Sequence, residues 1–211
     1  MGRLVSNTVT IRDVAEASGV SISLVSFVLN AKKGPNGEYL CSASKETAER
    51  IVDAANRLGY KKNMAASSLR SGFSNTLGIV VADISNSFFG EVCRHIENIS
   101  AQAGYLSIFG SSDDNPEKIC QLLNRFIATG VDGLIVAPCA HTEKLLSDIV
   151  RNSVPVVIFD RDLENLAGVG KVMMDNEYAG RQATRHLIEN GHKKIEMIRY
   201  QSDIPTILQR F

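Results

Sequence analysis

Residues 9–30 have the sequence VTIRDVAEASGVSISLVSFVLN, in which small, turn-forming and apolar residues fall where a helix-turn-helix requires them. Ala15 is small enough to let two helices touch, and Gly19 can take the positive φ of a tight turn. Val25 lies where it can pack the second helix onto the first. An ordinary helical hairpin is the alternative, because Ala-x-x-x-Gly alone is common. Together with its flanking helix caps, the pattern favours a DNA-binding element.

Cap residues mark the ends of three helices in this part of the chain. Thr10 and Ser21 can cap helices over about residues 11–17 and 22–29. A third apolar stripe at helical spacing stops at Gly59, a C-cap residue; its members are Ala48, Ile51, Val52, Ala55 and Leu58. Three short helices predict a small N-terminal headpiece.

The composition is that of a soluble globular chain. It has 211 residues, of which 44% are hydrophobic and 22% charged, enough for a core and more than one domain. No apolar run has membrane-spanning length, and the N-terminal sequence MGRLVSNTVT has no signal-peptide core. The cysteines form no C-x-x-C pair, which predicts reduced thiols and a cytoplasmic protein; they are Cys41, Cys93, Cys120 and Cys139.

The formal net charge of +0 conceals an uneven distribution. Up to Gly72 the chain has 10 Lys or Arg against 6 Asp or Glu, whereas the remainder has 13 against 17. A basic head on an acidic body directs phosphate contacts to the head. A solvated charged face accounts for many of these lysines individually, so the segregation of charge is the informative feature.

From Thr76 onward, apolar strand segments alternate with amphipathic helices. The clearest helix carries Phe89, Val92, Ile96, Ile99 and Ala103 at spacings of three and four. This alternation predicts a parallel, doubly wound sheet, which binds ligands at the carboxyl ends of its strands. The expected strands cover residues 77–81, 106–109, 133–136, 156–159, 172–174 and 195–198.

Several segments together resemble the lac repressor (LacI/GalR) family of bacterial transcription regulators, in the order of that family from residue 9 to about residue 198. Besides residues 9–30, they are SKETAERIVDAANRLGY (44–60), NMAASSLRSG (63–72), LGIVVADISNSFF (77–89), GVDGLIVAP (130–138), VPVVIFDRD (154–162) and ATRHLIENGHKKI (183–195).

The resemblance implies an all-α helix-turn-helix headpiece followed by an α/β periplasmic-binding-protein-like domain. The expected divisions are a headpiece at 1–62, a hinge helix and linker at 63–75, and an effector-sensing domain at 76–211. It also implies a homodimer that binds double-stranded operator DNA and responds to a small-molecule effector such as a sugar. Such a regulator is most often a repressor.

In the family, residues at the start of the second helix enter the major groove. The resemblance gives this role to Ile22, Ser23 and Phe27. Phe27 stands where the family often has arginine, and Leu24 where it usually has threonine, so we expect an unusual operator. Short polar groups remain to contact phosphate; they are Thr10, Ser21, Ser26 and Asn30. A helix-ending cap is an equally good interpretation of Asn30.

The segment NMAASSLR at 63–70 resembles the hinge helix of the family, with Lys62 in place of a common proline. Asn63 opens it, Ala66 allows close approach, and Leu69 holds the position that is wedged between base pairs in the minor groove. So short a helix is marginal alone. A plain linker is the alternative. Residues 31–43 form a longer loop than usual, for which a solvated surface loop is favoured over added DNA contacts from Lys32 and Lys33.

The loops at the expected strand ends carry aromatic, carboxylate, amide and guanidinium groups that suit a sugar or a related ring. The candidates are Asp83, Ser85, Asn86, Phe88, Phe89, Asp160, Arg161, Asp175 and Asn176. Each has a structural alternative: Asn86 can cap the following helix, one phenylalanine can belong to the core, and Asp160 with Arg161 can be a surface pair.

An enzyme is the competing class, because the same sheet carries many catalysts. The sequence has no phosphate-binding G-x-x-x-x-G-K-[ST], no G-x-S-x-G and no H-E-x-x-H. Its four histidines lack metal-ligand spacing, so we expect no catalysis, no cofactor and no metal. A transport binding protein would need an export signal and would not need residues 9–30.

The match to the family fails after Ile198, where Arg199 and Tyr200 replace the usual Gly-Gly. We therefore expect an incomplete second lobe, through truncation or a frameshift, or because the chain is a gene fragment; a gene fragment without function is the alternative to a working regulator. Such a sensor is expected to respond weakly to its effector. Unpaired strand edges and exposed apolar surface are expected to favour aggregation.

Overall fold

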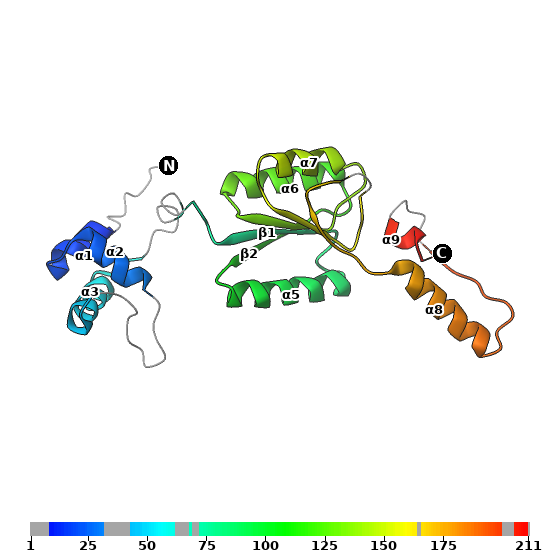
Figure 1. Cartoon of the computed structure of the whole chain (residues 1–211), viewed down its shortest axis with the longest axis horizontal. Helices are drawn as coiled ribbons and strands as arrows, with labels where there is room; N and C mark the ends of the chain where they lie inside the picture. Colours follow the sequence, from blue (N-terminus) through cyan, green and yellow to red (C-terminus); the bar gives the residue numbers. More distant parts are fainter. Residues whose placement is uncertain are drawn as a thin grey trace, which may run out of the picture. The chain divides into compact units, whose positions relative to one another are not determined.

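The computed structural model describes residues 9–31, 43–61, 68, 72–163, 166–199 and 205–210. The chain divides into two compact units, Met1–Ser67 and Ser68–Phe211. Each unit has its own elements and its own core (Figure 1).

The first unit is a bundle of three helices, α1 (Ile11–Ser18), α2 (Ile22–Asn30) and α3 (Lys45–Leu58). The bounds of α1 and α2 agree with the sequence prediction to within a residue at each end, and α3 ends before Gly59 as predicted but begins three residues before the predicted apolar stripe. Gly19 has a φ of 65°, and this left-handed conformation allows the sharp turn between α1 and α2. The predicted helix-turn-helix is confirmed.

The core of this unit explains why its small and apolar residues are spaced as they are. Ala15 on α1, Val25 on α2 and Ile51 on α3 are buried in one cluster. Helices as short as these gain most of their stability from such packing. The remaining buried members are Val14, Val28, Ala48, Ala54 and Ala55.

The second unit contains a five-stranded parallel sheet in the order β2-β1-β3-β4-β5. The strands are β1 (Thr76–Val81), β2 (Leu106–Ser111), β3 (Gly133–Val136), β4 (Val156–Phe159) and β5 (Gly170–Val172). The helices are α5 (Ser87–Gln102), α6 (Pro116–Thr129), α7 (Glu143–Arg151), α8 (Asn176–Glu189) and α9 (Pro205–Leu208). The order confirms the predicted doubly wound fold, and the strand order reverses between β1 and β3.

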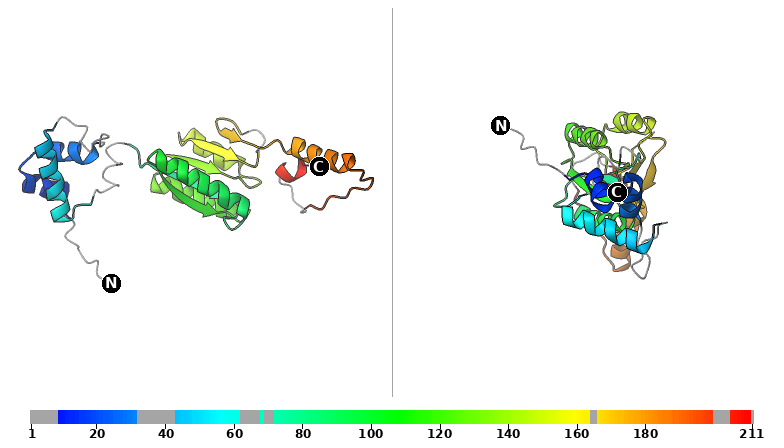
Figure 2. Two further views of the ribbon diagram at one scale, coloured as in Figure 1. Left: turned by 90° about the horizontal axis from the view of Figure 1, so that it is seen from below. Right: turned by 90° about the vertical axis from the view of Figure 1, so that its left-hand side faces the viewer.

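Two helices cover one face of the sheet and one covers the other. Figure 1 shows α6 and α7 together on one side and α5 on the opposite side, and Figure 2 shows α5 running along the strands. Alternate residues of β1 serve the two layers, because Val80 belongs to the cluster with α6 and α7 while Ile79 and Val81 belong to the cluster with α5. Gly78 allows close packing, since a Cβ there would lie 2.6 Å from the Phe126 ring.

Two strand predictions need correction. Residues 195–198 are not a strand, and Ile198 is 98% exposed. An apolar run becomes a strand only where a neighbouring strand satisfies its backbone, and none of the described strands pairs with this segment. The fifth strand lies at 170–172 and not at 172–174, because Gly170 is paired with Val157 and Val172 with Phe159.

Within the described residues, no helix is both long and apolar enough to cross a membrane. Large side chains on and around α8 are exposed, among them Val172, Tyr178 and Ile188.

Candidate nucleic-acid interface and effector site

One side of α2 is built to face outward. Val25 and Val28 fix the opposite side in the core, and the Ser21 Oγ begins the helix by accepting a hydrogen bond of 3.3 Å from the Leu24 N–H. Ile22 and Ser23 in the first turn are therefore exposed. Phe27, one turn further on, is 52% exposed. An exposed phenylalanine on a short helix offers an apolar contact to a partner.

At the end of α2, Asn30 is engaged with its own helix. Its Nδ2 donates hydrogen bonds to the Ser26 carbonyl oxygen at 2.6 Å and to the Ser26 Oγ at 3.3 Å. Asn30 is therefore the last residue of α2, bonded to the preceding turn, while Ala31 is the C-cap of the helix. The same contact orders Ser26.

Thr10 begins α1 through a capping box with Asp13. The Thr10 N–H donates to Asp13 Oδ2 at 2.7 Å, and the Thr10 Oγ1 accepts from the Asp13 N–H at 3.4 Å. The backbone hydrogen bond from Thr10 is the main reason why the pKa of Asp13 lies below its ordinary value. A phosphate that approached Thr10 would meet this carboxylate.

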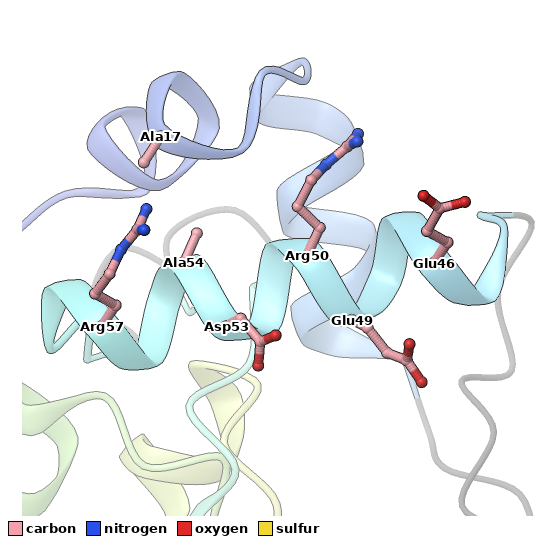
Figure 3. Close-up of a pocket in the computed structure, with 7 residues that line it drawn as sticks. All are labelled: Ala17, Glu46, Glu49, Arg50, Asp53, Ala54 and Arg57. Atoms are coloured by element: carbon pink, nitrogen blue, oxygen red, sulfur yellow. The ribbon is translucent and has the colours of Figure 1, made fainter.

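A groove between α1 and α3 has mixed charge. Figure 3 shows Arg50 and Arg57 on the same side of α3 as Ala54, with Arg57 pointing toward Ala17 of α1. Glu49 and Asp53 point the other way (Figure 3), and Glu46 completes the lining. The groove is therefore not a uniformly basic surface for phosphates.

Some candidate residues lie outside the described part of the chain. They are the hinge candidates Asn63, Ala66 and Leu69, together with Lys32 and Lys33 of the loop.

In the second unit, the carboxyl ends of the strands bring three predicted residues together. Asp160 and Arg161 follow β4, and Phe89 lies in the first turn of α5, shortly after β1. The Arg161 guanidinium carbon lies 5.9 Å from the centre of the Phe89 ring. They gather at the carboxyl ends of the strands, which is the edge at which open α/β sheets hold ligands.

Arg161 is held by a carboxylate on another loop. Its two terminal nitrogens pair with the two oxygens of Asp114, one of them at 3.3 Å. Its Nη1 also donates to the Pro138 carbonyl oxygen at 3.4 Å. Arg161 is only 8% exposed, so the pair is not the surface pair that the alternative proposed, and the guanidinium is fixed in place.

Asp160 occupies a confined position beside this guanidinium. Its φ is 63°, and its Oδ2 lies 3.7 Å from the Arg161 Nε. Burial raises the pKa of the Asp160 carboxyl above its ordinary value, although Arg161 and Arg210 oppose the shift. The Thr206 Oγ1 donates to the Asp160 carbonyl oxygen at 2.6 Å.

The two adjacent phenylalanines, Phe88 and Phe89, differ in burial. Phe89 is buried and packs edge-to-face on Phe159 at 6.1 Å, whereas Phe88 is 48% exposed and 5.1 Å from Phe89. One ring thus belongs to the core, as anticipated, and the other presents part of its face.

The turn after β1 is ordered by its own polar groups. The Ser85 N–H and Oγ both donate hydrogen bonds to the Asp83 carboxylate. These bonds, mainly the one from the hydroxyl, lower the pKa of the Asp83 carboxyl. The Asn86 Oδ1 accepts from the Phe88 N–H at 3.0 Å and caps α5. Asn86 therefore has the structural role that its alternative described.

Asp175 and Asn176 are likewise engaged at the start of α8. The Asp175 carboxylate accepts a hydrogen bond from the Tyr178 N–H at 2.8 Å, so Asp175 is the N-cap of α8. Asn176 is buried, donates to the Met174 carbonyl at 3.2 Å and accepts from the Arg210 Nε at 2.7 Å.

Sequence reasoning missed Asp114, the partner of Arg161. The sequence contains a signal for it, since the polar run SDDN at residues 112–115 lies between the second strand and the helix-opening Pro116. The contacts of Thr206 and Arg210 had no such signal, because they join residues 34 to 46 positions apart.

Comparison with known proteins gives two family matches. Residues 10–63 match the family described as "Bacterial regulatory proteins, lacI family". Residues 74–207 match "Periplasmic binding proteins and sugar binding domain of LacI family".

Similar curated proteins are named catabolite control protein A. That of Priestia megaterium is 35% identical over 190 residues, covering 90% of this chain and 54% of the relative. That of Staphylococcus epidermidis is 34% identical over 191 residues, covering 90% and 55%. The chain thus spans about half the length of these relatives.

Solved structures of related proteins resemble this chain over most of its length. A LacI-family transcriptional regulator from Silicibacter pomeroyi has a TM-score of 0.67 at 29% identity, over 88% of this chain and 53% of that one. The lac repressor dimer bound to operator and an anti-inducer has a TM-score of 0.73 at 22% identity, over 89% and 55%. At that identity the second likeness supports the fold alone.

Proposed function

This chain belongs to the LacI family of bacterial regulatory proteins, and from that premise we propose that it is a sequence-specific DNA-binding transcriptional regulator with a small-molecule-sensing unit. The observation that supports the proposal most directly is the outward-facing side of α2, where Ile22, Ser23 and Phe27 are exposed. A helix-turn-helix presents this side of its second helix to the major groove.

The chemistry of this side predicts which bases it prefers. Apolar Ile22 and Phe27 can contact a thymine methyl group but cannot offer hydrogen bonds to guanine. Ser21, exposed at the helix start, contacts phosphate and sets the register, with Ser26 and Thr10 nearby. In this proposal the protein is a cytoplasmic homodimer. It binds a pseudo-palindromic operator, with one headpiece on each half-site.

The hinge and the sensor complete the proposal. Asn63, Ala66 and Leu69 form the hinge, with Leu69 as the wedge in the minor groove. The sensor binds a hydroxyl-bearing ring such as a sugar against Phe88, Asp160 and Arg161. The helix caps and turns next to this site are stabilised by hydrogen bonds of Ser85, Asn86, Asp175 and Asn176. The relatives are regulators, and we propose no catalytic step.

Selection of binding sites from random DNA tests the first half of the proposal. We expect Phe27→Arg to shift the preferred sequence toward guanine at one position, because arginine binds the O6 and N7 of guanine. Ser21→Ala is expected to weaken all sites alike. Phe73→Arg is the matched control, since Phe73 is also exposed but lies outside the headpiece.

The outcomes are distinct. An unchanged preference for Phe27→Arg would remove Phe27 from the base-contacting set. A change of preference caused by Phe73→Arg would show that added charge alone is responsible. Absence of any enriched sequence with the unaltered protein would contradict sequence-specific binding.

A further inference from the structure

The cations near the strand ends of the second unit are already neutralised by two consecutive aspartates. Asp114 pairs with both terminal nitrogens of Arg161, and Asp113 pairs with Lys118. Both aspartates have left-handed backbones, with φ of 52° and 55°. Aspartate tolerates this conformation better than most residues do.

The surrounding charges leave no excess of positive charge for an anion. Asp160 lies 3.7 Å from the Arg161 Nε, and Arg210 is engaged with Asn176. Two guanidiniums therefore meet two carboxylates. Because the Arg161 side chain is nine-tenths buried, solvent screens this balance only weakly.

The nearest helix start is also occupied. The Asn115 Oδ1 accepts hydrogen bonds from the N–H groups of Glu117 and Lys118, at 2.8 and 3.1 Å. These are the groups that would otherwise attract a phosphate to the start of α6. The loop between β2 and α6 thus blocks two routes by which an anion is commonly bound.

We propose that Asp114 determines the charge class of the ligand, so that the site accepts neutral, hydroxyl-bearing molecules and rejects phosphorylated or carboxylated ones. This inference rests on the proposed sensing function. A neutral hydroxyl can donate a hydrogen bond to the Asp160 carboxylate, whereas a phosphate dianion can only accept. An anion would also have to displace Asp114 from a bidentate pair before it reached the two terminal nitrogens of Arg161.

Inorganic phosphate is the probe, because it needs only the guanidinium. The 211-residue chain is titrated at fixed pH and ionic strength while the NMR signal of the Arg161 Nε–H is followed. We expect no saturable shift in the unaltered protein. We expect Asp114→Asn to create saturable phosphate binding at Arg161, at least about tenfold tighter than the weakest binding that the titration of the unaltered protein would detect, the gain of roughly one charge-assisted contact.

Asp113→Asn is the matched control, since it removes a neighbouring carboxylate of the same loop but frees only the half-exposed Lys118. It is expected to leave the Arg161 signal unresponsive to phosphate. Saturable phosphate binding at Arg161 in the unaltered protein would overturn the inference. The inference would also be overturned if the Asp114→Asn variant folded but its Arg161 Nε–H signal showed no saturable shift with phosphate.

A second measurement covers the case in which Asp114→Asn does not fold. The unaltered protein is titrated with glucose and with glucose 6-phosphate while the Phe88 and Phe89 amide signals are followed. A stronger response to the phosphorylated sugar would overturn the role of Asp114. A response to glucose alone would support it. If no neutral sugar in a wider panel produced a response, the sensing function would fail, while the phosphate titration would still decide the claim about Asp114.

Discussion

At the scale of the residue, Asp160 combines a confined position with a cost to stability. Burial raises the pKa of its carboxyl in the folded protein. A carboxyl whose folded pKa exceeds its unfolded pKa contributes stability in acid, and this contribution is lost as the pH rises through the folded pKa. At neutral pH the buried charge therefore opposes folding, which is a common property of binding sites.

We predict that Asp160→Asn raises the melting temperature of the second unit at neutral pH and has little effect in acid, where Asp160 is already neutral. Thermal melts over a range of pH measure the difference. Asp83→Asn is the control of opposite sign, because hydrogen bonds from Ser85 lower the pKa of Asp83; it is expected to destabilise at neutral pH and to lose its effect in acid. Equal shifts for Asp160→Asn at every pH would contradict the assignment.

At the scale of the element, the start of α1 depends on the capping box between Thr10 and Asp13. We predict that Thr10→Ala lowers the free energy of unfolding of the headpiece by about 1 kcal/mol, because the Asp13 N–H loses its side-chain acceptor. Denaturant unfolding followed by helical circular dichroism measures it. Ser23→Ala, a serine on the exposed side of α2, is the control and is expected to change stability by less than about 0.5 kcal/mol.

The elements also show where local pattern is sufficient. Helices α1, α2 and α3 have a cap residue, an apolar stripe and, for α1 and α3, a terminal glycine, so their bounds were predictable from adjacent residues. Residues 195–198 have a strand-like apolar pattern as well. They do not form a strand, because strand formation depends on a paired neighbour, which no local pattern supplies.

At the scale of the whole molecule, the two units have hydrophobic clusters that share no residue. We predict that each unit has its own unfolding transition. Ile51→Ala and Ile158→Ala form a matched pair, since each removes a fully buried isoleucine at a cost of about 2–5 kcal/mol. Differential scanning calorimetry is expected to show Ile51→Ala lowering one transition and Ile158→Ala the other. A single transition that both variants shift equally would contradict this prediction.

The helix-turn-helix and the alternating strands of the sheet were predictable without coordinates, because each depends on residues close together in the chain. Ala15, Gly19 and Val25 act within 11 positions, and each of the first four strands has its own apolar run, whereas the fifth, Gly170–Val172, has none and was misplaced. The effector candidates were found by the same means, since strand ends meet at one edge of a parallel sheet.

Tertiary folding settled which of those candidates lie together. Arg161 is fixed by Asp114, 47 positions away, and Asp160 by Thr206, 46 positions away. Asn30, Asn86 and Asp175 are instead held by their own helices. The type of a polar residue does not show whether it lies in the site or caps its own helix. Its role depends on which groups the folded chain brings within hydrogen-bond distance, and that distance is set by packing between segments far apart in sequence.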